Sequence, residues 1–326
     1  YGFHVSTTAI NLLVAGLVGG PHLYSTFGYT LADGGFRKKY NWVLLPCVLI
    51  PMGVVWLALN NLVLLLTIFF FWASIHVLHQ IAYLTDVYRF KDPRPRSLFN
   101  RAIDYGVIFT GLYVNSSGRL VRGEFVVGGG TSPRSLLIPS FAQNNEWIPL
   151  LTAAAFATFL TLYVIKTVKE AREGRLNLPS VAIISVTTVM SLIIPTFKNI
   201  DIAFQGYNTW HSFQYLALVW YINKLRLEHG EIKGPIMGSV ARAQSPAKFY
   251  GLFFLATVIA FGASLVLQFG FGWPRDAAYY SVVLGTLLVH YYLDAINFTR
   301  FGLVLREPGA AELGRGMAAA PEAAVA

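Results

Sequence analysis

The chain has 326 residues, of which 55% are hydrophobic and only 13% are charged, and its formal net charge is +9. The charged fraction is about half that of an ordinary soluble domain, which excludes a conventional soluble protein. The positive charge does not indicate a nucleic-acid partner, because a nucleic-acid site needs a contiguous basic face. The basic residues here lie in short loops between apolar segments.

Nine apolar segments follow one another along the chain, and most approach the roughly 20 residues that a helix needs to cross the hydrocarbon core. They lie at 6–28, 41–59, 62–86, 99–115, 147–167, 179–197, 204–224, 248–270 and 277–300. We therefore predict an all-α protein whose residues 1–307 form a single polytopic bundle of about nine transmembrane helices in the lipid bilayer.

The placement of the basic clusters predicts the topology. They fall at 37–39, 89–101, 166–175, 224–248 and 300–306. If the short segment 99–115 crosses the membrane, every cluster lies on one side, and an excess of Lys and Arg marks the cytoplasmic side. We therefore expect an integral protein of the bacterial inner membrane with its N-terminus outside and its C-terminus inside.

Two parts of the chain are expected outside the bundle. The segment near 116–146 is an outer loop in this topology, although Arg119 and Arg122 count mildly against that side. The last segment, 308–326, is rich in Ala, Gly and Glu without an apolar pattern, and we expect a disordered cytoplasmic tail.

Five histidines lie within the apolar segments: His22, His76, His79, His211 and His290. Ionisable side chains are costly inside a bilayer and are usually functional there. The predicted topology puts all five between the middle of the bilayer and its cytoplasmic half. A histidine can simply hydrogen-bond across helices, but a shared depth favours one metal site.

Helical spacing sharpens this prediction. His76 and His79 are one turn apart, as are His290 and Asp294, so each pair lies on one helix face. Asp294 can bind the ion directly, or it can orient His290 by accepting its other ring N–H.

Two further polar features of these segments have a structural interpretation. Gly19, Gly20 and Pro21 predict a kink or break just before His22, which delivers that side chain into the bundle. Asp86, about two turns beyond His79, is interpreted as a salt-bridge partner of Arg89 or Lys91.

Histidine alone does not choose between zinc, copper, iron and nickel. Iron is preferred, with zinc and haem b as alternatives, because a site buried in lipid is best reached by a lipophilic small molecule and by oxygen. The single cysteine, Cys47, lies far from the other candidates, so thiolate ligation is not expected. Tyr83 and Tyr215 lie near the predicted ligands and are the candidate catalytic residues.

Some of these residues resemble a known family. A histidine on an early span after a Gly-Pro turn (His22), one on a later span (His76 or His79) and a late i,i+4 pair are similar to the bacterial Brp/Blh family. That resemblance implies a multi-spanning, iron-dependent enzyme that cleaves β-carotene to retinal. The late pair here is His290 and Asp294, where the family has two histidines, and His211 has no assigned counterpart.

The predicted function is therefore a membrane metalloenzyme that oxidises or cleaves an isoprenoid, a carotenoid or a lipid. Two alternatives stay open. One is a haem-b or pigment-binding subunit for electron transfer, with other membrane subunits as partners. The other is a transporter that uses its His and Asp groups as a relay.

Overall fold

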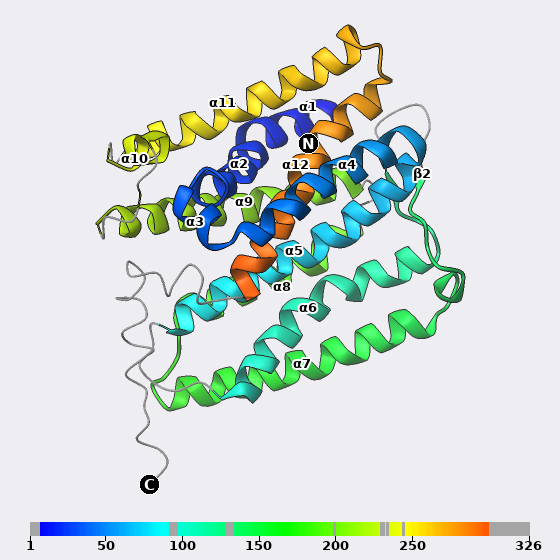
Figure 1. Ribbon diagram of the computed structural model, residues 1–326. Coiled ribbons are helices and arrows are strands. Elements are labelled where there is room, and N and C mark those ends of the chain that lie inside the picture. The colour runs from blue at the N-terminus through cyan, green and yellow to red at the C-terminus, as the bar shows by residue number, and fades with distance from the viewer. Residues whose placement is uncertain are drawn as a thin grey trace. The chain divides into compact units, whose positions relative to one another are not determined.

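The computed structural model describes residues 7–90, 97–127, 134–197, 200–228, 232, 235–242 and 245–299. Helices make up most of these residues (Figure 1). In chain order the elements are α1 (Thr7–Val14), the π-helix η1 (Ala15–Gly19), α2 (Gly20–Tyr29), α3 (Gly34–Lys39), η2 (Asn41–Val43), α4 (Leu44–Asn60), α5 (Leu62–Phe90), α6 (Leu98–Val121), β1 (Val126–Val127), β2 (Arg134–Ser135), η3 (Ser140–Ala142), α7 (Trp147–Arg172), α8 (Leu178–Ile193), η4 (Ile194–Thr196), α9 (Ile200–Glu228), α10 (Pro235–Arg242), α11 (Pro246–Leu265), the π-helix η5 (Val266–Gly270) and α12 (Arg275–Thr299).

The all-α prediction is confirmed, and each of the nine predicted segments coincides with helix in the described part of the chain. Within that part, six helical segments are long and apolar enough to cross a membrane. They are Asn41–Asn60, Leu62–Arg89, Trp147–Arg172, Leu178–Thr196, Pro246–Gly270 and Arg275–Phe298. The remaining predicted spans correspond to α1–α2, α6 and α9.

The outward-facing side chains of these helices are strongly apolar. Examples that are more than half exposed are Met52 and Trp56 on α4, Ile165 on α7, Ile259 on α11 and Phe269 on η5. Apolar surface of this extent is an aggregation liability in water. In lipid it is the ordinary surface of a helix, so the fold suits a membrane environment.

The predicted outer loop near 116–146 begins later than expected. Helix α6 continues to Val121, beyond the predicted end at 115. Arg119 is accommodated on this extension because its guanidinium donates to the backbone carbonyls of Pro195 and Phe197. The loop then holds the short antiparallel pair β1–β2, in which Val126 is opposite Ser135.

The predicted bundle of residues 1–307 divides into two compact units. The described residues of the first are 7–76, 208–228, 232, 235–242 and 245–299, and those of the second are 77–90, 97–127, 134–197 and 200–207. Helices α5 and α9 contribute to both units. The predicted tail, 308–326, lies outside the described residues.

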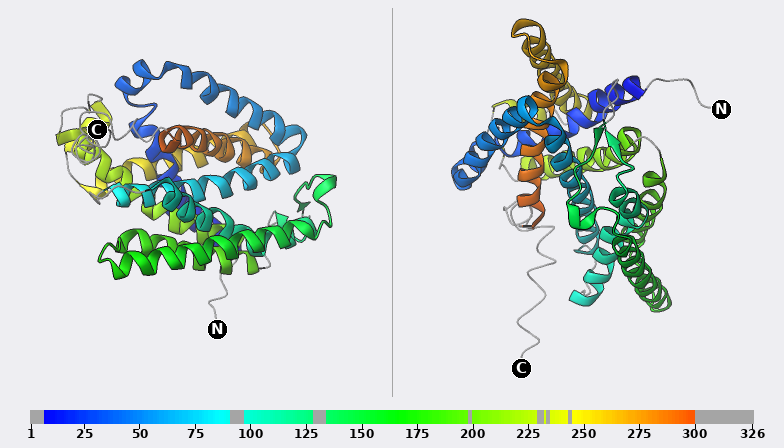
Figure 2. Two further views of the ribbon diagram at one scale, coloured as in Figure 1. Left: turned by 90° about the horizontal axis from the view of Figure 1, so that it is seen from below. Right: turned by 90° about the vertical axis from the view of Figure 1, so that its right-hand side faces the viewer.

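In the first unit, α12 is the central helix. It lies alongside α4 (Figures 1 and 2), and a Cβ atom at Gly285 would be in ordinary van der Waals contact with Pro51 of α4. Helix α2 packs against both α11 and α12. A Cβ atom on Gly28 would lie only 2.7 Å from the ring of Phe253, so α2 and α11 meet at a glycine. The close packing fixes α2 beside α12.

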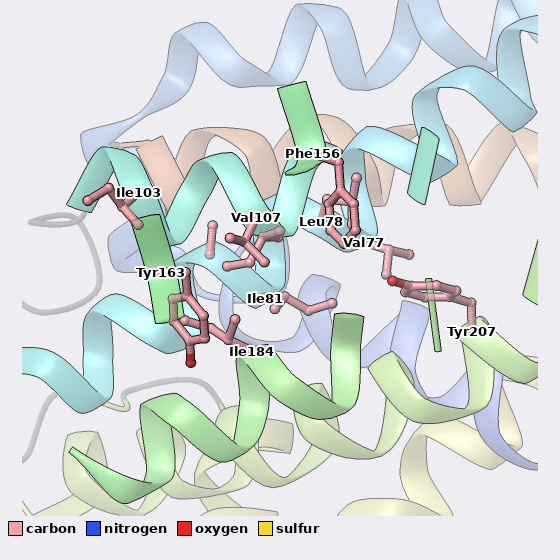
Figure 3. Close-up of a cluster of buried hydrophobic side chains, with 11 residues drawn as sticks. Val77, Leu78, Ile81, Ile103, Val107, Phe156, Tyr163, Ile184 and Tyr207 are labelled. Carbon is pink, nitrogen blue, oxygen red and sulfur yellow. The ribbon is translucent and has the colours of Figure 1, made fainter. Parts of the chain in front are cut away.

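In the second unit, α6 packs against α7 and α8. A cluster of eleven buried side chains from α5, α6, α7, α8 and α9 is drawn as sticks in Figure 3. They are Val77, Leu78, Ile81, Ala82, Ile103, Val107, Ile108, Phe156, Tyr163, Ile184 and Tyr207. Gly106 of α6 contributes to the fit because a side chain at that position would clash with Phe159 of α7.

The second unit also pairs two acids with two bases, of which Asp104 and Lys166 are buried and Arg89 and Glu170 are partly buried. Lys166 is hydrogen-bonded to Asp104, and Arg89 Nη1 lies 3.0 Å from Glu170 Oε2. Arg89 Nη2 is 3.9 Å from Asp104 Oδ2, so the four groups form one network with no formal net charge. Buried charges of this kind are tolerated only when they are paired.

Asp86 in the same unit is paired with two residues of α6. Its Oδ2 lies 2.7 Å from Arg101 Nη2 and accepts a hydrogen bond of 2.8 Å from Tyr105. Arg89, one of the two predicted partners, pairs with Glu170 and approaches Asp104. Lys91 lies outside the described residues.

Candidate metal centre

Four of the five predicted histidines meet inside the first unit. Each offers one ring nitrogen, and the four nitrogens all lie within 4.8 Å of one another. They come from four helices: His22 from α2, His76 from α5, His211 from α9 and His290 from α12. All four residues are at most 4% exposed.

The segment before His22 departs from α-helical geometry, as the Gly-Gly-Pro sequence predicted. Residues Ala15–Gly19 form a π-helix, and α2 begins at Gly20. Pro21 has no N–H with which to bond the carbonyl of Leu17. That carbonyl instead accepts a 2.6 Å hydrogen bond from Tyr250 of α11. The chain thus changes helical geometry without a sharp break, and His22 is buried.

The four imidazoles pack edge to face in a closed cycle. Ring centroids are 4.4 Å apart for His22 and His211, 5.1 Å for His211 and His76, 4.9 Å for His76 and His290, and 4.6 Å for His290 and His22. Tyr291 stacks on His76 at 4.1 Å and covers one ring face.

Asp294 lies beside two of the histidines. Its Oδ2 is 3.6 Å from Nδ1 of His290 and 4.0 Å from Nε2 of His76. The carboxylate is fully buried, as are the two rings next to it. The predicted pair of His290 and Asp294 is therefore assembled on one face of α12, and the acid also approaches a histidine of α5.

The other carboxylate oxygen of Asp294 belongs to a cluster of hydroxyl groups. Tyr215 of α9 donates to Oδ1 at 2.6 Å, and Thr26 and Tyr29 of α2 do so at 3.3 Å. The Tyr29 and Tyr215 hydroxyls are 2.7 Å apart, and Asn297 of α12 donates to Tyr29 at 3.0 Å. These side chains tie three ligand-bearing helices together.

Sequence reasoning included Tyr215 but missed Thr26, Tyr29 and Asn297. A signal was available in their spacing. Thr26 and Tyr29 follow His22 by four and seven residues, and Asp294 and Asn297 follow His290 by the same intervals. Such spacing puts each set of three on one helix face.

Several polar atoms of the centre are buried without a hydrogen-bond partner among the described residues. They are both ring nitrogens of His22, Nε2 of His290 and Oδ2 of Asp294. A buried polar group left in this state costs about 1–3 kcal/mol. A cation bound between the rings would satisfy nitrogen lone pairs and offset the negative charge of the carboxylate.

His79 is a predicted ligand that the structure does not bring into this group. It is half-buried and is absent from the close set of four nitrogens. Three residues after His76, its side chain is rotated by about 60° around α5 and displaced by about 4.5 Å along it. Tyr83, the other predicted site residue of α5, is buried and belongs to the second unit.

Comparisons with protein-family models, with curated proteins and with solved structures found no match to this chain.

Proposed function

We propose that His22, His76, His211 and His290 bind a single transition-metal ion and that the protein is an integral-membrane metalloenzyme. The observation that carries this proposal is that the four buried ring nitrogens all lie within 4.8 Å of one another. Metal–imidazole bonds are about 2.0–2.1 Å long, so nitrogens on opposite sides of one ion are about 4 Å apart. A small inward movement of the rings is sufficient for ligation.

Among metals, we propose non-haem iron, with zinc as the alternative. Imidazole is a good ligand for both. Haem b fits these residues less well. A porphyrin has to pass between its two axial imidazoles, and here neighbouring rings 4.4–5.1 Å apart pack edge to face and occupy that space.

The proposed substrate is a lipophilic molecule such as an isoprenoid, a carotenoid or a lipid. The four ligands are buried in an apolar helical unit that suits lipid, and a lipid-soluble compound can approach them without crossing an aqueous domain. Bound iron would supply the redox chemistry for oxidation or cleavage with oxygen. Tyr215, whose ring centroid is 4.5 Å from that of His22, is the predicted catalytic tyrosine that lies beside the ligands and would position a reacting group.

The proposed topology has nine crossings in a bacterial inner membrane, with the N-terminus outside. Support comes from the basic clusters and from the helical stretches α1–α2, α6 and α9, which coincide with the other three predicted spans and are less apolar than the six helices named above. Helix α6, for example, carries Asp104, whose charge is paired with Lys166 of α7. Pairing of this kind lets a helix with ionisable residues lie in a bilayer.

The alternative of a His and Asp relay transporter has one specific observation in its favour. The hydroxyl groups of Thr26, Tyr215 and Tyr29 form a continuous hydrogen-bonded chain beside Asp294. A transporter of this kind needs no resident metal. Metal content therefore separates the two functions.

The test is elemental analysis of protein purified in detergent and reconstituted separately with Fe²⁺ and Zn²⁺. We expect one tightly bound ion per chain in the wild type and loss of that ion in His76→Ala. His79→Ala is the matched control, since it removes a histidine from the same helix and should retain the ion. A wild type that binds neither metal above background would overturn the proposal.

A further inference from the structure

Beyond the ligands themselves, we infer that Thr26 is a positioning residue that sets the tautomer of His290 and so makes its Nε2 the metal-binding atom. The consequence for metal binding rests on the proposed function, whereas the tautomer itself does not. Thr26 Oγ1 lies 2.7 Å from Nδ1 of His290, and both residues are fully buried.

The hydroxyl of Thr26 is directed differently from those of Ser25 and Thr30. Ser25 of α2 donates to the carbonyl of His22, and Thr30, which directly follows α2, donates to the carbonyl of Thr26, so both bond to the backbone of this helix. The Thr26 hydroxyl instead contacts Tyr215 of α9 and two residues of α12, His290 and Asp294. The Thr26 side chain therefore links α2 to α9 and α12.

Counting protons along these bonds fixes their direction. Tyr215 donates its single hydroxyl proton to Oδ1 of Asp294 at 2.6 Å. Tyr215 then has no proton left for Thr26, so the single Thr26 proton goes either to the Tyr215 oxygen at 2.5 Å or to Oδ1 of Asp294 at 3.3 Å. Because Thr26 has only one proton, its oxygen is the acceptor toward His290, which must carry its proton on Nδ1.

The reverse direction leaves a group unsatisfied. In that case Asp294 would donate to Tyr215, Tyr215 to Thr26, and Thr26 to Nδ1, which would put the imidazole proton on Nε2. Nε2 of His290 has no hydrogen-bond partner in the described part of the chain, so an N–H there would be a buried donor without an acceptor. A lone pair at Nε2, by contrast, is what a metal ion requires.

Threonine suits this task because its branched side chain is restricted at χ1 to two main rotamers in a helix. His22 lies one turn before Thr26 on the same face of α2. One turn of α2 therefore supplies a ligand and the group that orients a second ligand from another helix. A change at Thr26 should alter metal binding through His290 while the backbone of α2 is retained.

The experiment measures the tautomer directly, by NMR of ¹³C,¹⁵N-histidine-labelled protein in lipid without metal. The His290 signals are assigned by their loss in His290→Gln. We expect the proton on Nδ1 in the wild type and in Thr26→Ser, which keeps the hydroxyl. Thr26→Val should shift the population toward Nε2–H. Thr30→Val is the matched control, a buried threonine at the C-terminal end of the same helix whose hydroxyl bonds to a backbone carbonyl, and should leave the signals unchanged.

Zn²⁺ affinity, measured by competition with a chromophoric chelator, is the second readout. It should fall about 10–100-fold in Thr26→Val, the effect usual for groups that orient a metal-bound histidine, and recover in Thr26→Ser. His290 protonated on Nε2 in the wild type would overturn the inference, whether or not Thr26→Val folds. An unchanged tautomer in a folded Thr26→Val protein would also overturn it. A tautomer shift in a protein that binds no metal would support the role of Thr26 and contradict the proposed function.

Discussion

Asp294 follows His290 by one turn of α12, and its Oδ2 lies 3.6 Å from the Nδ1 of that histidine. Both side chains are completely buried. A carboxylate in an apolar helical unit needs positive charge or donors nearby. Three hydroxyl groups lie within hydrogen-bond distance of its Oδ1. Ring nitrogens of His290 and His76 lie 3.6 and 4.0 Å from its Oδ2. A divalent ion held by the histidines would offset the negative charge of this carboxylate.

The first prediction concerns Asp294→Asn, which keeps the size of the side chain but removes its charge. We expect the variant to insert into membranes and purify normally, with metal affinity lowered about 10–100-fold, because the acid orients and compensates the ligands. Asp33→Asn is the control, as Asp33 pairs with Arg226 and lies outside the histidine cluster. Chelator competition measures the affinity. Full metal occupancy in Asp294→Asn would show that the carboxylate has no part in the site.

A second prediction concerns removal of the metal. A ligand that binds only the folded state stabilises it by about 2.7 kcal/mol at a hundred times its dissociation constant. Chelation should therefore lower the melting temperature of the detergent-solubilised protein, and added Zn²⁺ should restore it. The effect should weaken as the pH falls, because imidazoles must lose their protons to bind.

The control for this experiment is His76→Ala. Its melting temperature should not respond to Zn²⁺, because one of the four ligands is absent. A response in the variant equal to that of the wild type would place the bound ion elsewhere in the protein.

The third prediction concerns the buried network of the second unit. Lys166→Met should destabilise the protein by about 3–5 kcal/mol, because Asp104 loses its closest cation and stays buried. Lys169→Met removes a lysine that is exposed on the same helix and should have little effect. Removing the acid as well, in Lys166→Met with Asp104→Leu, should recover part of the loss. Thermal unfolding in detergent measures each difference, and equal stabilities of the two lysine variants would exclude a structural role for the network.

Much of the fold could be predicted because apolar length determines a membrane helix. All nine predicted segments are helical where the structure describes them. The helix ends were less predictable. The predicted end of α6 at 115 was too early, because Arg119 on the extension of this helix is bonded to carbonyls of a segment distant in sequence. Sequence spacing carries no information about such a partner.

The candidate site was predictable for a similar reason. His22, His76, His211, His290 and Asp294 stand out since ionisable groups are rare in apolar segments. Shared depth and spacing could not show which of His76 and His79 joins the cluster, because the rotation of α5 about its own axis depends on packing. Thr26 and Asn297 were missed because hydroxyl and amide side chains are common in membrane helices, and only their contacts reveal a role.

The last prediction is the topology, tested by two single-cysteine variants. In a Cys47→Ala background, Lys169→Cys and Asn144→Cys each introduce one exposed thiol, the first at the end of α7 and the second before its beginning. Nine crossings with the N-terminus outside put Lys169 in the cytoplasm and Asn144 on the outer face, since basic residues concentrate on the cytoplasmic side. An impermeant maleimide added to intact bacterial spheroplasts should therefore label Asn144→Cys and leave Lys169→Cys unmodified until the membrane is permeabilised. Labelling in the opposite order would invert α7 and overturn the proposed topology.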